Sequence, residues 1–199
     1  MEKKILQKVL KQSYILASKS PRRGQLLKQI GLKFKAVDSK IQELDSMNYN
    51  PIRLVKHNSL LKSRNVALSY KKEIIIGADT IVYLNDSILN KPKDMKEAKK
   101  FLRMLSNNLH YVYTGINIIN TKNGNEIFDY ERTSVYFRDL SDEEINYYVK
   151  NYKPLDKAGA YGIQDDFGCL FIERIAGDYY NIVGLPLVKL YANLCKILN

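Results

Sequence analysis

The chain has 199 residues, 45% of them hydrophobic and 27% charged, which suits one sizeable domain with an apolar core and excludes a disordered or collagen-like chain. No apolar run approaches the roughly 18 residues of a membrane-spanning helix, and the first dozen residues are too polar for a secretory signal. The formal charge of +11 suits a nucleic acid, an anionic membrane or a phosphorylated ligand, but 24 of the 32 basic residues are lysines spread along the whole chain, a pattern typical of a solvated surface.

The first half of the chain alternates short apolar runs, which predict strands, with apolar residues at helical spacing. Ser20 and Pro21 are typical of a helix start, and Gly77 follows a run of three isoleucines, where we expect a strand to end. In chain order we expect a strand over 14–17, a helix over 21–30, a strand over 34–37, a helix over 51–69, and strands over 74–76, 81–84 and 88–89.

The second half contains the strongest local signals. Asn123-Gly124 between two alternating runs predicts a β-hairpin, and Ser141 followed by Glu144 predicts a capping box. Cys169 lies in an apolar run, so we expect a buried thiol in a strand. In chain order we expect a helix over 94–105, strands over 111–120 and 126–137, a helix over 141–151, a strand over 169–175 and a helix over 186–197. Helical crossovers combined with a hairpin predict an α/β fold with a mixed sheet.

The segment Ser18-Lys19-Ser20-Pro21-Arg22-Arg23 lies between a strand and a helix. A helix start offers free backbone N–H groups, and arginines bind phosphate oxygens in pairs, so the segment suits a polyphosphate. An ordinary capped helix with solvent-facing arginines fits the spacing equally well.

Two further segments carry single charged residues. Asp79 follows the three isoleucines, where its carboxylate can reach a crevice at a strand end and hold Mg²⁺ or orient water; an aspartate that starts a turn is the alternative. Lys91 precedes Pro92 in an extended segment, as a phosphate contact or as a plain loop lysine.

The glycine-containing stretches 156–164 and 177–186 suit either a close approach to a ligand or tight connections.

Taken together and in this order, these segments resemble the Maf-like nucleoside triphosphate pyrophosphatases over about residues 14–194. The matching motifs are L-A-S-K-S-P-R-R from Leu16, G-A-D-T from Gly77, K-P at Lys91, D-K-A-G-A-Y-G-I-Q from Asp156, and G-D-Y-Y followed by G-L-P from Gly177. The chain then divides into an N-terminal extension over 1–12 and one Maf-like domain over 13–199.

The resemblance implies a two-lobed α/β fold around a long mixed sheet, with a nucleotide in the cleft between the lobes. It implies hydrolysis between the α- and β-phosphates with Mg²⁺ or Mn²⁺. The implied catalytic residues are Glu43, Lys62, Asp79 and Lys91, and the implied metal ligands are Glu43 and Asp79. We expect Lys62 and Lys91 to face the cleft rather than the core. The implied substrate-binding residues are Ser18, Ser20, Arg22, Arg23, Thr80 and Gln164.

Within the family, Arg22, Thr80 and Gln164 resemble the combination of the branch that prefers dTTP and UTP. Departures are modest, such as Asn90 where the family usually has glycine before Lys-Pro, and none removes a charged catalytic position. The resemblance suggests a cytoplasmic homodimer that sanitises the nucleotide pool.

Two other classes of function stay open. One is a nucleotide-binding regulator, linked to cell division arrest, that keeps the pocket without turnover; the charged residues at the catalytic positions argue against it. The other is a nucleic-acid-binding module, which the charge alone suggests. No basic cluster with interleaved aromatic residues supports it, so we expect neither nucleic acid nor membrane as a partner.

Overall fold

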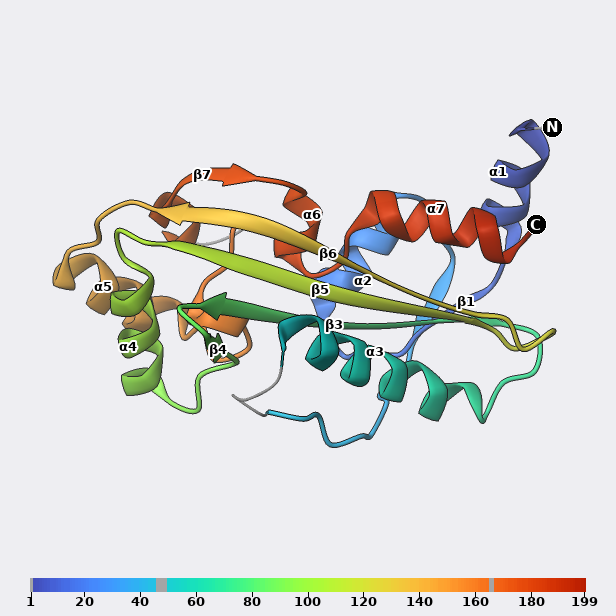
Figure 1. The fold of residues 1–199 in the computed structure, drawn as a ribbon, viewed down its shortest axis with the longest axis horizontal. Helices are drawn as coiled ribbons and strands as arrows, with labels where there is room; N and C mark the ends of the chain where they lie inside the picture. The colour runs from blue at the N-terminus through green and yellow to red at the C-terminus, as the bar shows by residue number, and fades with distance from the viewer. Residues whose placement is uncertain (1, 46–49, 165–166) are drawn as a thin grey trace.

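The fold is a single mixed β-sheet with helices packed on it (Figure 1). The computed structural model describes residues 2–45, 50–164 and 167–199. Within these ranges the strands are β1 (Tyr14–Leu16), β2 (Phe34–Ala36), β3 (Ile74–Leu84), β4 (Ser87–Leu89), β5 (Leu109–Asn120), β6 (Glu126–Phe137) and β7 (Ile172–Ala176). The α-helices are α1 (Glu2–Lys11), α2 (Pro21–Gln29), α3 (Pro51–Ala67), α4 (Met95–Leu105), α5 (Asp142–Tyr152), α6 (Tyr179–Val183) and α7 (Leu187–Ile197).

The sheet has the order β2-β1-β3-β5-β6-β7, with β4 paired to β3 as well. Strand β1 is parallel to β2 and β3, whereas the other pairs are antiparallel. The expected mixed α/β sheet is therefore confirmed. The predicted hairpin is also present, because β5 and β6 pair along most of their length on either side of Asn123-Gly124.

Strand β3 differs from the expectation in a way that matters for the site. It does not end at Gly77 but runs unbroken from Ile74 to Leu84, because β5 pairs with it from Ile74 to Tyr83. On its other edge, β1 pairs with residues 74–76 and β4 pairs with residues 82–84. Residues 77–81 lie between these two partners on that edge, so Asp79 occupies the middle of a long strand.

The hydrophobic core is divided into clusters at the two ends of the sheet, which confirms the two-lobed architecture. One cluster joins β1, α2 and α7 through residues such as Leu16, Leu27 and Leu190. Another joins α4 and α5 to the sheet through residues such as Leu102 and Tyr148. Helix α3 packs on the sheet face opposite α7 (Figure 1), where Val66 contacts the Ile75 side of β3.

The starts of α4 and α5 follow the sequence signals, whereas Ser20 precedes α2 as expected but makes no side-chain capping hydrogen bond. In α5 the Ser141 side chain accepts from Glu144 N–H at 3.2 Å, and the Glu144 carboxylate accepts from Ser141 N–H at 2.9 Å, which confirms the capping box. In α4 the Asp94 side chain accepts from Glu97 N–H at 2.7 Å. Both contacts satisfy backbone donors that the first helical turn leaves free.

The stretch expected to be an N-terminal extension forms α1, which lies against the C-terminal helix (Figure 1). Val9 is buried, its carbonyl accepts from the Tyr14 hydroxyl at 2.8 Å, and Lys8 donates to Leu198 O at 3.3 Å. Residue 1 of the extension lies outside the described residues. No α-helix in the described ranges has the length and apolarity that crossing a membrane requires.

The region after α5 departs most from the sequence expectation. The predicted strand over 169–175 is wrong in its first part, because Phe167–Phe171 form a 3₁₀ helix and β7 begins only at Ile172. The expected burial of Cys169 is wrong for the same reason, since the turn directs this residue to the surface. The stretch 177–186, expected either to approach a ligand or to form a tight connection, contains a helix, α6, which begins after Asp178, whose carboxylate accepts from Tyr180 N–H at 2.7 Å.

Candidate active site

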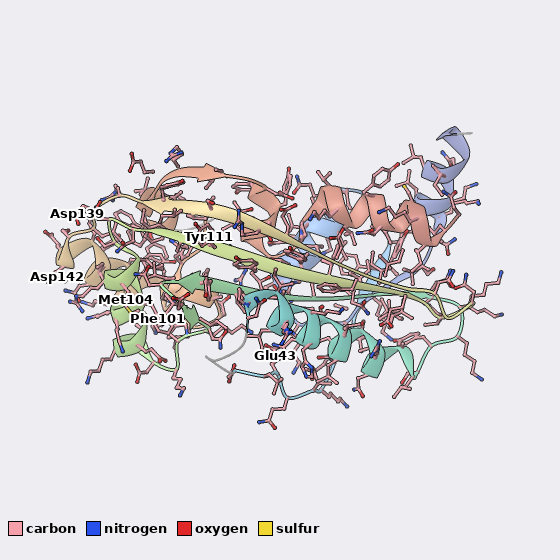
Figure 2. All side chains as sticks on the ribbon, viewed as in Figure 1. Glu43, Phe101, Met104, Tyr111, Asp139 and Asp142 are labelled. Atoms are coloured by element: carbon pink, nitrogen blue, oxygen red, sulfur yellow. The ribbon has the colours of Figure 1, made fainter. Side chains whose placement is uncertain are left out.

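A cleft of about 1160 Å³ runs between the two lobes. All ten residues that the resemblance implied line it: Ser18, Ser20, Arg22, Arg23, Glu43, Lys62, Asp79, Thr80, Lys91 and Gln164. Its wall in the second lobe includes Phe101 and Met104 of α4, while Glu43 lies beside α3 (Figure 2). The fold thus brings residues more than 140 positions apart to one cavity.

The floor of the cleft is the stretch of β3 that lies between β1 and β4. Because no strand covers that edge in the described structure, the Asp79–Thr80 segment opens into the cleft instead of into another strand. The sheet therefore holds Asp79 in a fixed position, and this residue is only 5% exposed.

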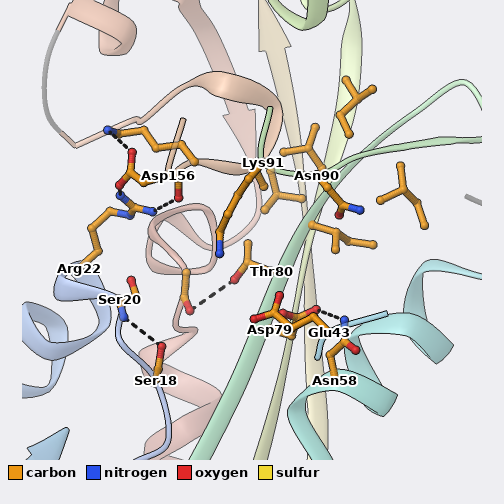
Figure 3. A pocket seen from close by; sticks show the side chains of 18 of the residues that line it. Ser18, Ser20, Arg22, Glu43, Asn58, Asp79, Thr80, Asn90, Lys91 and Asp156 are labelled. Carbon is orange, nitrogen blue, oxygen red and sulfur yellow. Dashed lines mark hydrogen bonds and ion pairs between the residues drawn. The ribbon is translucent and has the colours of Figure 1, made fainter. Parts of the chain in front are cut away.

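The Asp79 carboxylate lies at the centre of a charged cluster (Figure 3). Lys62 Nζ donates to Asp79 Oδ1 at 2.6 Å and contacts Glu43 Oε1 at 2.9 Å, and it also donates to Ala78 O at 3.2 Å. Lys62 was expected to face the cleft rather than the core. It does line the cleft, but its side chain is almost fully buried beneath it.

Asn58 contacts this cluster, although it was not among the predicted site residues. Its amide donates to Asp79 Oδ2 at 3.0 Å and to Leu44 O at 3.2 Å, and its Oδ1 accepts from Leu44 N–H at 3.0 Å. Asn58 thereby fixes the Asp79 carboxylate and holds the segment that carries Glu43 against α3. A signal was present, because Asn58 and Lys62 are four positions apart on one helix face.

Two glycines allow α3 to approach the sheet this closely. A Cβ on Gly77 would lie 2.4 Å from Ser59 O, and a Cβ on Gly115 would lie 2.6 Å from Val55 O. Any side chain at either position would push α3 away from β3 and β5. The two glycines therefore set the short distance between α3 and the sheet at which Asn58 and Lys62 contact Asp79.

The electrostatics keep Glu43 ionised. Burial acts to raise the pKa of Glu43, but the adjacent Lys62 ammonium, with Lys91 and Arg23 further off, outweighs burial and leaves this pKa below its usual value. Lys91 is exposed on the opposite side, and its amine points into the cleft toward the Thr80–Asp79 stretch (Figure 3).

The two arginines of the α2 start have different roles. Arg23 is buried and donates from Nε to Gly184 O at 2.8 Å, from Nη1 to Ser18 Oγ at 3.1 Å and from Nη2 to Thr80 Oγ1 at 3.0 Å. Burial lowers the pKa of Arg23, while the Asp79 and Glu43 carboxylates act in the opposite direction. Arg23 is thus held in place by three partners across the floor of the cleft.

Arg22 reaches across the cleft mouth to the other lobe. Its Nη1 lies 2.5 Å from Asp156 Oδ2 and its Nη2 donates to Asp156 O at 3.1 Å (Figure 3). Burial acts to raise the pKa of Asp156, but the Arg22 guanidinium outweighs it and lowers that pKa. Asp156 begins one of the motifs that carry the family resemblance, yet it was not among the predicted site residues.

Thr80 is oriented by a chain of hydroxyl groups. Thr114 Oγ1 donates to Asn181 O at 3.0 Å, so the 2.9 Å contact between the two threonine hydroxyls has Thr80 as its donor. Since Arg23 donates to one lone pair of Thr80 Oγ1, the other remains an acceptor. Toward a ligand, the Thr80 hydroxyl therefore offers an acceptor.

The carboxylates of Glu43 and Asp79 fit a hard divalent cation. Both contact the same atom, Lys62 Nζ, so their oxygens converge on one small region. No group of three or more potential histidine, cysteine or acidic ligands occurs in the described part of the chain. Mg²⁺ commonly takes one or two carboxylates and completes its shell with water and substrate phosphates, which matches this donor set.

Similarities to known proteins extend along most of the chain. The chain is 47% identical to a dTTP/UTP pyrophosphatase of Dictyoglomus turgidum, over 91% of this chain and 94% of that protein. It is 50% identical to a dTTP/UTP pyrophosphatase of Thermosipho melanesiensis, over 89% and 93% respectively. The Staphylococcus aureus Ham1 protein matches in structure with a TM-score of 0.48 and 16% identity, over 81% of this chain and 80% of that one. Because the model of the family described as "Maf-like protein" matches residues 13–197, the chain belongs to the Maf-like protein family.

Proposed function

We propose that this protein is a nucleoside triphosphate pyrophosphatase that hydrolyses dTTP and UTP to the monophosphate and pyrophosphate. The observation that carries the proposal is the Asp79 carboxylate, fixed by Lys62 and Asn58 beside Glu43 on the floor of a cleft whose other side presents cations. The names of the relatives, which match along nearly the whole chain, support the same activity and substrates.

The triphosphate would bind where the cations of both lobes face the cleft. A nucleoside triphosphate brings about four negative charges, and arginine and lysine bind phosphate oxygens through charge-assisted hydrogen bonds. Lys91 approaches from the second lobe, while Arg22 and the backbone N–H groups of the α2 start approach from the first. Asp156 holds Arg22 in the ligand-free protein, and a phosphate oxygen can replace that carboxylate partner.

The reaction adds a water oxygen to the α-phosphorus and breaks its bond to the bridging oxygen, so that pyrophosphate leaves. A divalent cation, Mg²⁺ or Mn²⁺, held by Glu43 and Asp79, would offset charge on the phosphates and acidify water. Both roles open to the Asp79 carboxylate, proton acceptor and cation ligand, require its negative charge. Lys62 orients that carboxylate through the 2.6 Å contact between its Nζ and Asp79 Oδ1, and Lys91 stabilises charge on the phosphates.

The preference for thymine and uracil follows from two polar side chains that line the cleft, Thr80 on its floor and Gln164. Thr80 presents an acceptor, which matches the imide N–H of these bases, and the Gln164 amide offers both a donor and an acceptor. Cytosine has no imide N–H and would leave the Thr80 acceptor unpaired, and sites built for hydrogen bonding discriminate strongly against such a mismatch.

A panel of triphosphates tests the proposal. The purified protein would be assayed for pyrophosphate release from dTTP, UTP, CTP, GTP and 7-methyl-GTP with Mg²⁺ or Mn²⁺. We expect pyrophosphate, not orthophosphate, and the highest kcat/KM with dTTP and UTP. Equal rates with all five, or a preference for 7-methyl-GTP, would overturn the base assignment but not the reaction. Nucleotide binding without any release would point instead to a regulator. Since the cytoplasm holds the nucleoside triphosphate pool, the proposal places the enzyme there.

A further inference from the structure

His110 is a fully buried titratable residue that the proposed reaction does not use. It lies in β5, and its Nε2 is hydrogen-bonded to the Tyr161 hydroxyl at 2.7 Å. Its Nδ1 is also buried and has no hydrogen-bond partner among the described residues. Burial lowers the pKa of His110 to about 3, so the ring is neutral wherever the enzyme works. Tyr161 is thus the polar partner on which this histidine depends.

A third ring completes the arrangement. The Phe137 ring centroid lies 5.0 Å from that of His110 and 4.8 Å from that of Tyr161, both in edge-to-face geometry. Such contacts add to the burial energy and fix the relative orientation of the rings. Tyr161 is only 5% exposed, yet it lines the cleft. One face of a cleft-lining residue is therefore anchored in the core of the second lobe.

Tyr161 belongs to the loop over 156–164, which contacts both sides of the site. Asp156 at its start binds Arg22, and Gln164 at its end lines the cleft. Between them, Gly159 N–H donates to Asn90 O at 3.2 Å, and Asn90 directly precedes Lys91. The loop packs closely on β3 at Gly159, where φ is +67° and an added Cβ would lie 2.9 Å from the Val82 side chain, so this position suits only glycine.

We propose that His110 acts, through Tyr161, as a positioning residue that fixes the 156–164 loop and with it the placement of Gln164 and Lys91. The inference rests on the proposed function, because it assigns base selectivity to the loop. His110 itself does not line the cleft. The pair holds the loop from behind, and the hydrogen bond between two buried groups defines a single position for it, where apolar packing alone would allow several.

The test is Tyr161→Phe, which removes the hydroxyl and keeps the ring. The matched control is Val149→Ala, a truncation in α5 within the same apolar cluster and away from the cleft. We expect Tyr161→Phe to lower kcat/KM for dTTP about 10-fold, since small misplacements of positioned groups reduce rates by such factors. We also expect the ratio of kcat/KM for dTTP over CTP to narrow, whereas the control keeps that ratio.

Two further measurements separate positioning from stability. Hydrogen exchange of the amides over 156–164 should accelerate in Tyr161→Phe and stay unchanged in Val149→Ala. In a double-mutant cycle, His110→Phe combined with Tyr161→Phe should cost no more selectivity than either change alone, because each breaks the same bond.

A lowered melting temperature of Tyr161→Phe, with an unchanged ratio of kcat/KM for dTTP over CTP, would show that the pair of His110 and Tyr161 is only structural. That result would overturn the inference. Additive losses of selectivity in the cycle would do the same. If the wild-type protein released no pyrophosphate from any triphosphate, the proposed function would fail, and the exchange measurement would then decide the anchoring by itself.

Discussion

The backbone of Gly77 in β3 lies directly beneath the carbonyl oxygen of Ser59 in α3, so closely that a Cβ would approach this oxygen to 2.4 Å. Real Cβ atoms do not come this near, and the obstacle is backbone, which cannot rotate away. One hydrogen atom in place of a side chain therefore fixes the distance between the helix that carries Lys62 and the strand that carries Asp79.

We expect Gly77→Ala to displace α3 and to impair stability and activity together. Overpacking a close contact costs about 1–3 kcal/mol, and the shift lengthens the contacts of Lys62 and Asn58 with Asp79, so kcat should fall at least about 10-fold. The measurements are the urea midpoint and the rate of pyrophosphate release.

The control for this prediction is Gly24→Ala in α2. There a Cβ would meet only the outer edge of the Phe34 ring at 3.3 Å, and alanine in a helix is favoured by about 0.5–1 kcal/mol. We expect its stability to be equal to or above that of the wild type. Wild-type activity in Gly77→Ala would contradict the view that this glycine sets the distance between α3 and β3.

The predictable part of the fold is the part with local causes. The hairpin at Asn123-Gly124 and the capping box of Ser141 and Glu144 involve residues a few positions apart, and both are present as expected. The end of β3 was misplaced because the strand continues only through its pairing with β5, some forty residues later in the chain. Cys169 was misplaced because an apolar run cannot distinguish a strand from a tight 3₁₀ turn.

The same distinction holds for the site. The resemblance supplied the ten cleft residues, which the fold indeed brings to one cavity. It did not supply Asn58, whose importance comes from a contact with Asp79 across 21 positions. Nor did it distinguish Arg22 from Arg23, because only the folded structure shows that one faces the mouth of the cleft and the other its floor.

Asp79→Asn keeps the shape of the side chain and removes its charge. Whether the carboxylate accepts a proton or ligates the cation, we expect kcat to fall by about 100-fold or more. The steady-state rate with saturating Mg²⁺ is the measurement, with circular dichroism to verify the fold. A folded variant with a rate within a few-fold of the wild type would show that Asp79 has neither role.

The two site lysines should respond differently to truncation because their burial differs. Lys91 is exposed, so Lys91→Ala should lower activity sharply and leave the melting temperature almost unchanged. Lys62 is buried between two carboxylates, so Lys62→Ala should lower both, since removing one partner of a buried ion pair costs about 3–5 kcal/mol. Equal melting temperatures for the two variants would contradict the burial argument.

The surface pair of Arg138 and Glu144 should make stability depend on acid. Arg138 donates to both Glu144 carboxylate oxygens, at 2.6 and 3.2 Å, which lowers the pKa of Glu144 from 4.5 to about 2. The Glu144 carboxyl group binds its proton less tightly in the folded protein than in the unfolded chain. The ion pair therefore contributes fully to the free energy of unfolding above about pH 4.5, and this contribution disappears as the pH falls toward 2. Solvent screening limits it to about 1 kcal/mol.

We therefore expect Glu144→Gln to have a lower free energy of unfolding than the wild type at neutral pH. Below about pH 3 the two values should become nearly equal. Urea unfolding at a series of pH values measures the difference. Glu143→Gln, which makes the same charge change one residue earlier in the same helix turn, is the control and should follow the wild-type curve. A constant difference between Glu144→Gln and the wild type at every pH would exclude the ionic contribution.

The neighbouring arginines allow the sharpest comparison, because lysine keeps the charge and loses the planar fork. Arg23 uses three nitrogens for three separate acceptors, Gly184 O, Ser18 Oγ and Thr80 Oγ1. One ammonium cannot reach all three, so Arg23→Lys leaves buried acceptors unpaired at about 1–3 kcal/mol each and releases Thr80. We expect a lower melting temperature, a large loss of kcat/KM and a weaker preference for dTTP.

Arg22→Lys is the matched variant, with the same chemical change one residue earlier. Its main partner, the Asp156 carboxylate, is half-exposed at the mouth of the cleft, and a lysine can keep that single ion pair. We expect an unchanged melting temperature and a loss of kcat/KM of about 10-fold or less, expressed mostly in KM. If Arg22→Lys were the more damaging of the two, the guanidinium at the mouth, and not the one on the floor beside Thr80, would be the group that fixes the substrate.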